Sequence, residues 1–285
     1  MLSRFDYFKP ESLEEALSYL EENPETKILA GGTDLIILLS RNRITCEHIL
    51  DIKAIPEANE LSFSNNEGLF IGAAVTVNQI CENNIIREKY PAISEAADNL
   101  ASYQIRNRAT LVGNICNASP GADLAAPLLV YDAKVHIASK EGNRVVELNE
   151  FFLGVRKTVL KENEIVIGIF VPDVETGDNS IYLRKSRIKG HDLCNVGLAI
   201  RLTKEKKLLL AIAAVASTPL RLTEIEEEIE GKEITPELCQ WIGEEIKKYM
   251  EPRSTSIRSS PEYRYHIAKV LAKRGILKLI EKGAN

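Results

Sequence analysis

The chain has 285 residues, and 45% of them are hydrophobic, which is enough to bury a substantial core. Its 36 lysines and arginines against 41 aspartates and glutamates give a formal net charge of −5, which argues against nonspecific binding to nucleic acid or to an anionic membrane surface. Residues 1–10 contain no continuous apolar run, so they are not expected to be a secretory signal, and no apolar run approaches the roughly 18 residues that a membrane span needs. A cytoplasmic protein without membrane insertion is expected.

The N-terminal region predicts the order helix, strand, glycine turn and helix. Ser12 and Glu15 form a capping-box pattern before a helix that ends ahead of Pro24. Residues 27–29 are typical of a short buried strand, residues 30–32 of a tight turn, and residues 33–34 of the N-cap of a helix over residues 35–39. Free backbone N–H groups at such a turn are a common phosphate-binding arrangement, so this segment is the first candidate ligand motif.

The middle of the chain changes to strands with short helices between them. Strands are predicted at residues 48–52, 61–63, 69–72, 134–138 and 144–148, and Thr76 and Pro91 mark the starts of two helices. Residues 165–171 form an uninterrupted apolar run that predicts a strand buried on both faces.

A second candidate motif lies between these elements, at residues 109–123 with the sequence ATLVGNICNASPGAD. Gly113 and Gly121 permit close approach of a backbone to a ligand, and the motif is rich in side chains that can form hydrogen bonds. We expect a polar loop here, with Asp123 capping a following helix. Two donor-rich glycine turns about 80 residues apart favour one large ligand held from two sides.

The C-terminal region predicts strands near residues 181–185, 195–203 and 207–216, followed by helices. Thr223 and Glu226 form a capping-box pattern, and Thr235-Pro236 and Ser260-Pro261 place proline at the first helical position. Five cysteines at irregular spacing and four scattered histidines offer no disulfide framework and no metal-ligand pattern, so no metal site is predicted. No convincing catalytic constellation of Cys, His, Ser or Asp is found, and no catalytic side chain is predicted.

Taken together, Ala30-Gly31-Gly32-Thr33-Asp34-Leu35, Gln104-Ile105-Arg106-Asn107 and Gly113-Asn114-Ile115-Cys116-Asn117-Ala118-Ser119-Pro120 with Asp123 closely resemble the FAD-binding medium subunit of the xanthine dehydrogenase and carbon monoxide dehydrogenase family of molybdenum hydroxylases. The resemblance covers essentially the whole chain. It implies an α+β architecture, the vanillyl-alcohol-oxidase-type (PCMH-type) FAD-binding fold of two α/β subdomains plus a C-terminal α+β domain. The expected divisions are residues 1–58, 59–175 and 176–285.

The resemblance also implies which residues contact FAD. They are Lys27, Ile28, Leu29, Ala30, Gly31, Gly32, Thr33, Asp34, Leu35, Ala101, Ala109, Thr110, Leu111, Val112, Gly113, Asn114, Asn117, Ser119, Asp123, Ile165, Val166, Arg184 and Lys185. Relatives often carry Gly-Gly where this chain has Val112-Gly113, so Val112 is expected to point away from the ligand. The lysine of the family aligns with Arg184, and Lys185 stands beside it; the alternative is that Arg184, Lys185, Arg187 and Lys189 form a solvated strand end.

By the same resemblance, the chain passes electrons between iron–sulfur clusters of a small [2Fe-2S] subunit and an external acceptor such as NAD, while a molybdopterin-binding large subunit holds the substrate. Two alternatives remain open. One is a free-standing flavin reductase on the same fold, which would need its own substrate site and proton donor. The other is a structural subunit without flavin, for which Val112 is the only feature in favour.

Overall fold

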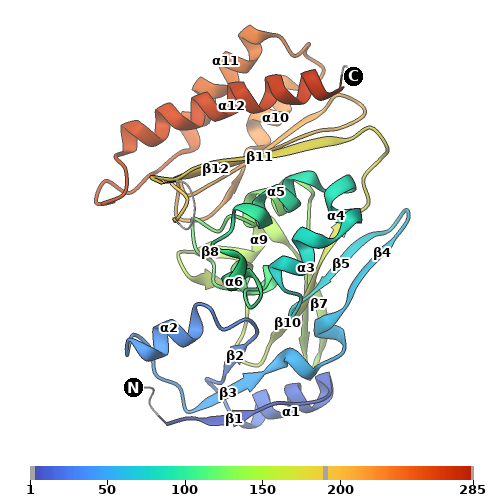
Figure 1. Ribbon diagram of the computed structural model, residues 1–285, viewed down its shortest axis with the longest axis vertical. Helices are drawn as coiled ribbons and strands as arrows, with labels where there is room; N and C mark the ends of the chain where they lie inside the picture. The colour runs from blue at the N-terminus through green and yellow to red at the C-terminus, as the bar shows by residue number, and fades with distance from the viewer. Residues whose placement is uncertain (1–3, 189–191, 284–285) are drawn as a thin grey trace.

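The computed structural model describes residues 4–188 and 192–283, and its sheets and helices form three layers along the long axis of the molecule (Figure 1). The N-terminal layer is a parallel sheet in the order β1-β3-β2, made of β1 (Asp6–Phe8), β2 (Lys27–Leu29) and β3 (His48–Asp51). Helix α1 (Leu13–Glu22) and helix α2 (Leu35–Ser40) flank β2 in sequence, and 3-10 helices follow at Ile52–Ala54 and Glu57–Asn59. Strand β2 is confirmed, but its three residues are half-buried rather than buried because β2 lies at the sheet edge.

The middle layer contains an antiparallel sheet in the order β4-β5-β10-β6-β7. Its strands are β4 (Leu61–Ser64), β5 (Gly68–Gly72), β6 (Lys134–Ser139), β7 (Gly142–Glu147) and β10 (Ile165–Pro172), all close to the predicted ranges. Its helices are α3 (Val77–Glu82), α4 (Asn84–Lys89), α5 (Pro91–Asn99), α6 (Tyr103–Arg106), α7 (Leu111–Cys116), α8 (Ala125–Val130) and α9 (Leu148–Phe151), and a separate hairpin joins β8 (Phe152–Gly154) to β9 (Lys157–Thr158).

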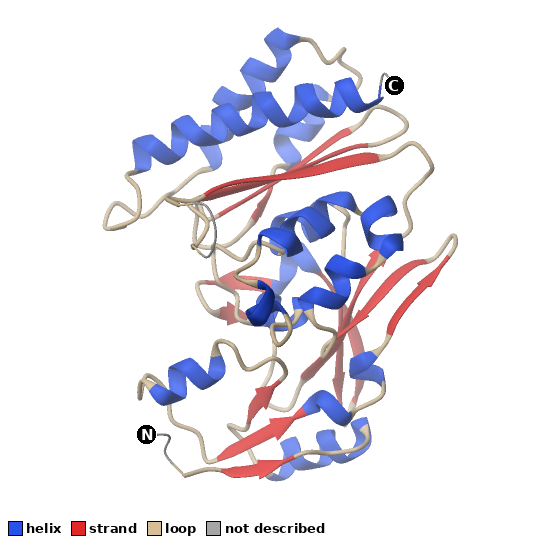
Figure 2. Ribbon diagram, in the orientation of Figure 1, coloured by secondary structure: helices blue, strands red, loops and turns tan. Residues whose placement is uncertain are grey.

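The C-terminal layer is a four-stranded antiparallel sheet covered on both faces. The sheet runs in the order β11 (Asn179–Lys185), β12 (Val196–Leu202), β13 (Leu208–Ala213) and β14 (Leu220–Arg221). Helices α5 and α8 of the middle layer pack on one face. Helices α10 (Thr223–Ile229), α11 (Pro236–Glu245) and α12 (Pro261–Gly283) lie on the other, with a 3-10 helix at Ile246–Tyr249 (Figure 2).

Local sequence signals explain several helix starts. Thr76 and Gln79 form a complete capping box at α3, and Thr235 caps α11 by accepting a hydrogen bond from the Leu238 amide. The predicted capping box at Thr223 is wrong, because Thr223 is the first helical residue of α10. Its partner Glu226 instead accepts hydrogen bonds from the Arg221 guanidinium and the Leu210 amide.

Two hydrophobic clusters hold these layers together. The first joins α1, the five-stranded sheet and helices α3 to α8, and also takes in Ala199 and Ala211 from the C-terminal sheet. The second fills the space between that sheet and α10 to α12. Because residues of β12 and β13 contribute to both clusters, the C-terminal sheet is bound to the middle layer through packed side chains; the exact division at residues 58 and 175 stays a prediction.

Two features are not found within the described parts of the chain. No helix there combines the length and the apolar character that crossing a bilayer requires. The same residues contain no group of three or more His, Cys, Asp or Glu side chains placed to hold a metal ion.

Candidate functional site

The turn after β2 presents a row of backbone donors. Among the described residues, no hydrogen bond is formed by the amide N–H groups of Gly31, Gly32, Thr33 and Asp34, whereas amides further into α2 are bonded. Asp34 is exposed and makes no capping bond, so the predicted cap at Thr33-Asp34 is wrong for Asp34. Lys53 holds the start of the turn, because its ammonium donates to the Ala30 carbonyl at 3.1 Å. Four neighbouring free amides form a local positive potential suited to an anion.

The first motif meets the second at Gly31. A Cβ atom on Gly31 would lie 2.1 Å from the Arg108 carbonyl oxygen and 2.9 Å from the Ala109 Cα. A side chain would therefore collide with backbone, and glycine is required here by contact between the two motifs. Gly32 adds a positive φ of 73°, which only glycine adopts easily. The two segments, about 80 residues apart in sequence, thus lie in direct contact.

The second motif is not the loop that its composition predicts, because helix α7 lies inside it. The Thr110 hydroxyl accepts a hydrogen bond from the Gly113 amide at 3.0 Å and caps the helix. Leu111, Val112 and Ile115 face the core, and Val112 is 3% exposed, so its side chain points away from the surface. The opposite side carries the half-exposed residues Gly113, Asn114, Cys116 and Asn117.

The strands and turns before α7 hold it firmly. The Val77 amide donates to the Ala109 carbonyl at 2.8 Å, and Thr76 pairs with Thr110 in an isolated bridge. Upstream, Ala101 adopts a φ of 49°, and Arg106 donates to the Leu100 carbonyl next to it. A second contact of Arg106, to Asn78, joins this turn to α3. The predicted residue Ala101 is therefore part of a constrained turn leading into the motif.

Asp123 has a different role from the predicted helix cap. Helix α8 begins at Ala125 without a side-chain cap, and the Asp123 carboxylate instead accepts a hydrogen bond from the Tyr182 hydroxyl at 2.8 Å. The Arg184 guanidinium lies 3.4 Å from the same carboxylate. Burial raises the pKa of Asp123, and the Arg184 charge and the Tyr182 hydroxyl oppose that rise. Asp123 thus connects the second motif to strand β11 of the C-terminal layer.

Arg184 and Lys185 point to opposite faces of β11, as neighbouring residues of a strand do. The Arg184 side chain is 7% exposed and also donates to the carbonyls of Asn99 at 2.6 Å and Asp192 at 2.5 Å. Lys185 is exposed, and so is Arg187. A solvated strand end therefore describes Lys185 and Arg187 but not Arg184; Lys189 lies outside the described residues.

Three buried polar atoms near this arrangement have no hydrogen-bond partner among the described residues. They are Asn114 Oδ1, Arg184 Nε and Asn195 Oδ1. An unpaired buried polar atom costs free energy, so three of them point to a polar ligand that is part of the working protein. Sequence patterns do not reveal Lys53, Tyr182 or Asn195, because each is a single polar residue without a motif around it.

The remaining predicted residues lie at the margins of this arrangement. Ile165 and Val166 begin β10, which packs against α7, and are 2% and 4% exposed, so their side chains belong to the core. Ser119 accepts a hydrogen bond from the Gly121 amide. The first-motif residues Lys27, Ile28, Leu29, Ala30 and Leu35 are half-buried along β2 and the start of α2.

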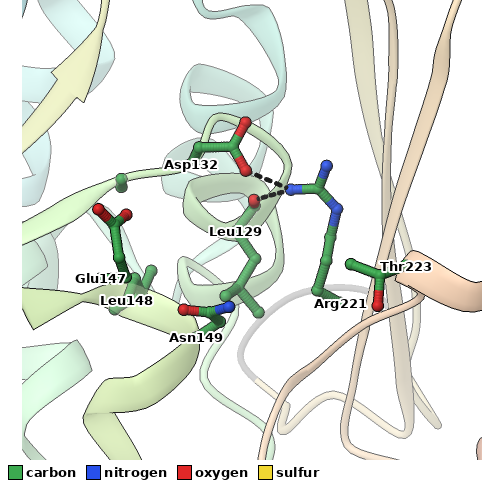
Figure 3. Close-up of a pocket in the computed structure, with 8 residues that line it drawn as sticks. Leu129, Asp132, Glu147, Leu148, Asn149, Arg221 and Thr223 are labelled. Carbon is green, nitrogen blue, oxygen red and sulfur yellow. Dashed lines mark hydrogen bonds and ion pairs between the residues drawn. The ribbon is translucent and has the colours of Figure 1, made fainter. Parts of the chain in front are cut away.

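A small cavity of about 120 Å³ lies elsewhere, between α8 and β14 (Figure 3). Within it, Arg221 donates to the Leu129 carbonyl and to Asp132. None of the predicted ligand-contacting residues lines this cavity. Because Arg221 is already paired with Asp132 and Glu226, we assign the cavity to packing between layers rather than to the site.

Comparison with known proteins gives a consistent result over the full chain. Two protein families match the sequence. The family described as "FAD binding domain in molybdopterin dehydrogenase" matches residues 3–174, and the family described as "CO dehydrogenase flavoprotein C-terminal domain" matches residues 181–279. The xanthine dehydrogenase FAD-binding subunit of Escherichia coli O157:H7 is 34% identical over 275 residues, which is 95% of this chain and 94% of the relative. The glyceraldehyde dehydrogenase medium chain of Sulfolobus acidocaldarius is 34% identical over 270 residues, 94% and 95% of the two chains.

Solved structures agree. A chain of carbon monoxide dehydrogenase from Hydrogenophaga pseudoflava, in a form that lacks the Mo-pyranopterin moiety of its cofactor, superposes with a TM-score of 0.92 at 30% sequence identity. The superposition covers 97% of each chain.

Proposed function

This chain belongs to the family of FAD-binding subunits of molybdopterin-dependent dehydrogenases, and on that premise we propose that it is the electron-transferring flavoprotein of a multi-subunit molybdenum hydroxylase. Its cofactor is FAD, and it is an oxidoreductase subunit. The proposal adds three finer points. A molybdopterin-binding subunit and a [2Fe-2S] subunit are its partners, electrons pass through this chain, and an acceptor such as NAD takes them, in the cytoplasm.

The residues of the two motifs fit FAD in their chemistry. The four free amides of residues 31–34 can receive the negatively charged pyrophosphate of a dinucleotide, and this observation carries the proposal furthest. Asn114 and Asn117 lie on the half-exposed side of α7, and the buried, unpaired Asn114 Oδ1 can accept a hydrogen bond from a ribose or ribityl hydroxyl. Lys53 supports the turn through its bond to the Ala30 carbonyl, and its own charge is paired with Asp51 at 2.6 Å.

The Asp123 cluster supplies the second side of the proposed site. Asp123 is held by Tyr182 and Arg184, so its carboxylate is fixed in place and is able to accept hydrogen bonds from the cofactor. The unpaired Arg184 Nε and Asn195 Oδ1 add one donor and one acceptor within the same part of the structure. Together, the backbone amides of the turn, the Asp123 carboxylate and the asparagine side chains favour a polar dinucleotide over an apolar ligand.

When bound, the flavin accepts electrons one at a time and delivers them in pairs, which is chemistry that no protein side chain provides. The work of this chain is then to bind, orient and shield. The Gly31 contact fixes the two motifs relative to each other, and the buried side chains of Val112 on α7 and Ile165 on β10 exclude water from the core side of the helix. No side chain is required as a general acid or base in this role.

The proposed role predicts a specific division of activity. The purified chain loaded with FAD should transfer electrons from an artificial reductant such as dithionite to an acceptor, while it oxidises organic substrates of molybdenum hydroxylases at no measurable rate. Stopped-flow absorbance of the flavin measures the first reaction and product analysis the second. Substantial oxidation of an organic substrate by the chain alone would contradict the proposal, because the substrate site is assigned to another subunit.

Gly113→Val is expected to empty the flavin site while the fold persists. A Cβ atom here meets only the Thr110 hydroxyl, at 2.7 Å, so the outer methyl groups of valine extend into open space on the side of α7 proposed to face the cofactor. The loss of the Thr110 cap costs about 1 kcal/mol. We expect at least a tenfold loss of bound FAD, read from the ratio of flavin to protein absorbance.

Gly113→Ala is the matched control for that variant, because it shares the contact with Thr110 but adds no atoms beyond Cβ. It should show a similar shift in melting temperature and retain most of its flavin. Equal flavin content in the valine variant and the unchanged protein would show that the cofactor does not lie against this side of α7.

A further inference from the structure

Exposed aliphatic side chains collect on three segments around the proposed site. They are Leu153 (66% exposed) and Val155 (46%) on the β8–β9 hairpin, Ile188 (62%) and Leu193 (51%) after β11, and Ile257 (95%) before α12. Large aliphatic side chains at this exposure are in contact with water, and covering them with another surface is favourable. A group of such side chains therefore indicates an interaction site. We refer to these five residues as the aliphatic surface.

One short stretch of the second motif, residues 118–121, contacts the first two segments directly and reaches the third through Ala214. The Arg156 amide at the hairpin tip donates to the Ala118 carbonyl at 2.9 Å. A Cβ on Gly121 would lie 3.7 Å from the Cys194 carbonyl, which directly follows Leu193. The Ala214 amide donates to the Pro120 carbonyl at 2.6 Å.

Arg264 extends this attachment to the segment that holds Ile257. It is 8% exposed, and its guanidinium donates to the Ala214 carbonyl and to the hydroxyls of Ser256 and Ser259. The β8–β9 hairpin and the loop before α12 accordingly face the same side, at the left of the view in Figure 1. The aliphatic surface thus borders the motif that is proposed to hold the flavin.

The net charge of the segments around the aliphatic surface is opposite in sign to the net charge of the whole chain. Within residues 153–157, 185–188, 192–193 and 251–260 there are six cationic side chains and two carboxylates, a net charge of +4, whereas the whole chain carries −5. The cations are Arg156, Lys157, Lys185, Arg187, Arg253 and Arg258. Five of them are exposed and Arg258 is half-exposed.

The positive charge around the aliphatic surface indicates the kind of partner that binds there. In a symmetric dimer the same cationic surface would face itself, and like charges brought together oppose association. A partner with acidic residues around an apolar centre would match both the aliphatic residues and their basic surroundings. A subunit that exchanges electrons with the flavin must also approach the flavin closely, and the aliphatic surface borders the residues assigned to it.

We propose that the aliphatic surface and its six surrounding cations dock the acidic face of the iron–sulfur subunit that exchanges electrons with the flavin. This inference rests on the proposed function, since it takes the identity of the partner from it. It adds the location of the interface, the residues that form it and the charge of the partner surface.

The test uses the FAD-loaded chain and the [2Fe-2S] subunit that the proposed function assigns to it, both prepared from the same host. Leu153→Asp combined with Val155→Asp should weaken their association about 30-fold, as expected for residues at the centre of an interface, while FAD content stays unchanged. Val145→Asp is the matched control: Val145 is also an exposed strand residue, at 54%, but lies on β7 outside the three segments, and its substitution should change affinity less than about twofold.

A second variant tests the charge. Arg253→Glu should slow association at low salt about tenfold, and this difference should disappear at high ionic strength, because screening removes steering between exposed charges. Binding kinetics by biolayer interferometry at two salt concentrations measure both effects.

The outcomes separate this inference from the proposed function. If the unchanged chain binds the iron–sulfur subunit and takes electrons from it, and the double aspartate variant does so equally well, the aliphatic surface is not the interface and the function stands. If the unchanged chain carries FAD but no iron–sulfur subunit binds it or reduces it, the proposed function fails. Binding of the unchanged chain, but not of the variant, to vesicles of anionic phospholipid would assign the surface to a membrane and overturn the inference.

Discussion

Gly31→Ala is expected to remove bound FAD and to destabilise the chain, although it adds a single methyl group. That methyl group would lie 2.1 Å from the Arg108 carbonyl oxygen, and both contacting groups are backbone that cannot rotate away. The β2–α2 turn and the entry to α7 would have to separate. Such overpacking costs about 1–3 kcal/mol of folding free energy. If it destabilises the FAD-bound form by about 1.4 kcal/mol more than the FAD-free form, the affinity for FAD drops about tenfold.

Gly121→Ala is the matched control for Gly31→Ala. It lies in the second motif, but its Cβ would make only ordinary contacts at 3.7 Å with Ala214 and Cys194, so both flavin content and stability should be nearly unchanged. Calorimetry and flavin absorbance compare the two variants, and the Gly31 variant should melt roughly 2–10 °C lower. If both alanine variants keep their flavin equally, direct contact between the two motifs is not what holds the cofactor.

Asp123→Ala should have the largest effect on stability of the variants considered. It leaves the Arg184 guanidinium, 7% exposed, without its carboxylate, and it removes the acceptor of the buried Tyr182 hydroxyl. Removing one partner of a buried ion pair typically costs about 3–5 kcal/mol, because the remaining charge is buried without compensation. Urea unfolding at neutral pH measures this loss, and FAD binding should fall with it.

Two further variants identify the cause of that loss. Asp132→Ala also removes a carboxylate from a buried arginine, Arg221, but Asp132 is 61% exposed and Arg221 keeps Glu226, so the cost should stay below about 1 kcal/mol. Combining Asp123→Ala with Arg184→Met removes the stranded charge and should recover part of the stability without restoring FAD binding. If Asp123→Ala and Asp132→Ala lower the free energy of unfolding equally, the buried pair of Asp123 and Arg184 contributes no more to stability than the exposed carboxylate of Asp132.

Much of the framework follows from local patterns in the sequence. Strands β4 and β5 are predicted by the apolar runs at residues 61–63 and 69–72, and the start of α3 is predicted by Thr76. The apolar run of β10 predicts a strand at the centre of a sheet. These features depend on residues within a few positions of each other, so sequence patterns report them directly.

The errors occur where distant segments decide the outcome. Asp123 has the right residue type for a helix cap, but the competing partners Tyr182 and Arg184 are about 60 residues away and cannot be seen in local sequence. In the same way, the local sequence around Gly31 gives no sign that this turn lies against Arg108 and Ala109, whose backbone occupies the space that a side chain on Gly31 would need. Helix α7 is missed because two glycines and five polar residues make residues 109–123 resemble a loop.

The contacts of Arg184 limit how proteins of this type can be recombined. This arginine belongs to the C-terminal sheet, yet it bonds the end of α5, Asp123 of the second motif and the loop at Asp192. A chimera spliced between β10 and β11 would therefore combine an aspartate from one parent with an arginine from another, and a truncation there would expose the carboxylate to water. Engineers who exchange the catalytic partners of such enzymes should move the entire flavoprotein as one unit.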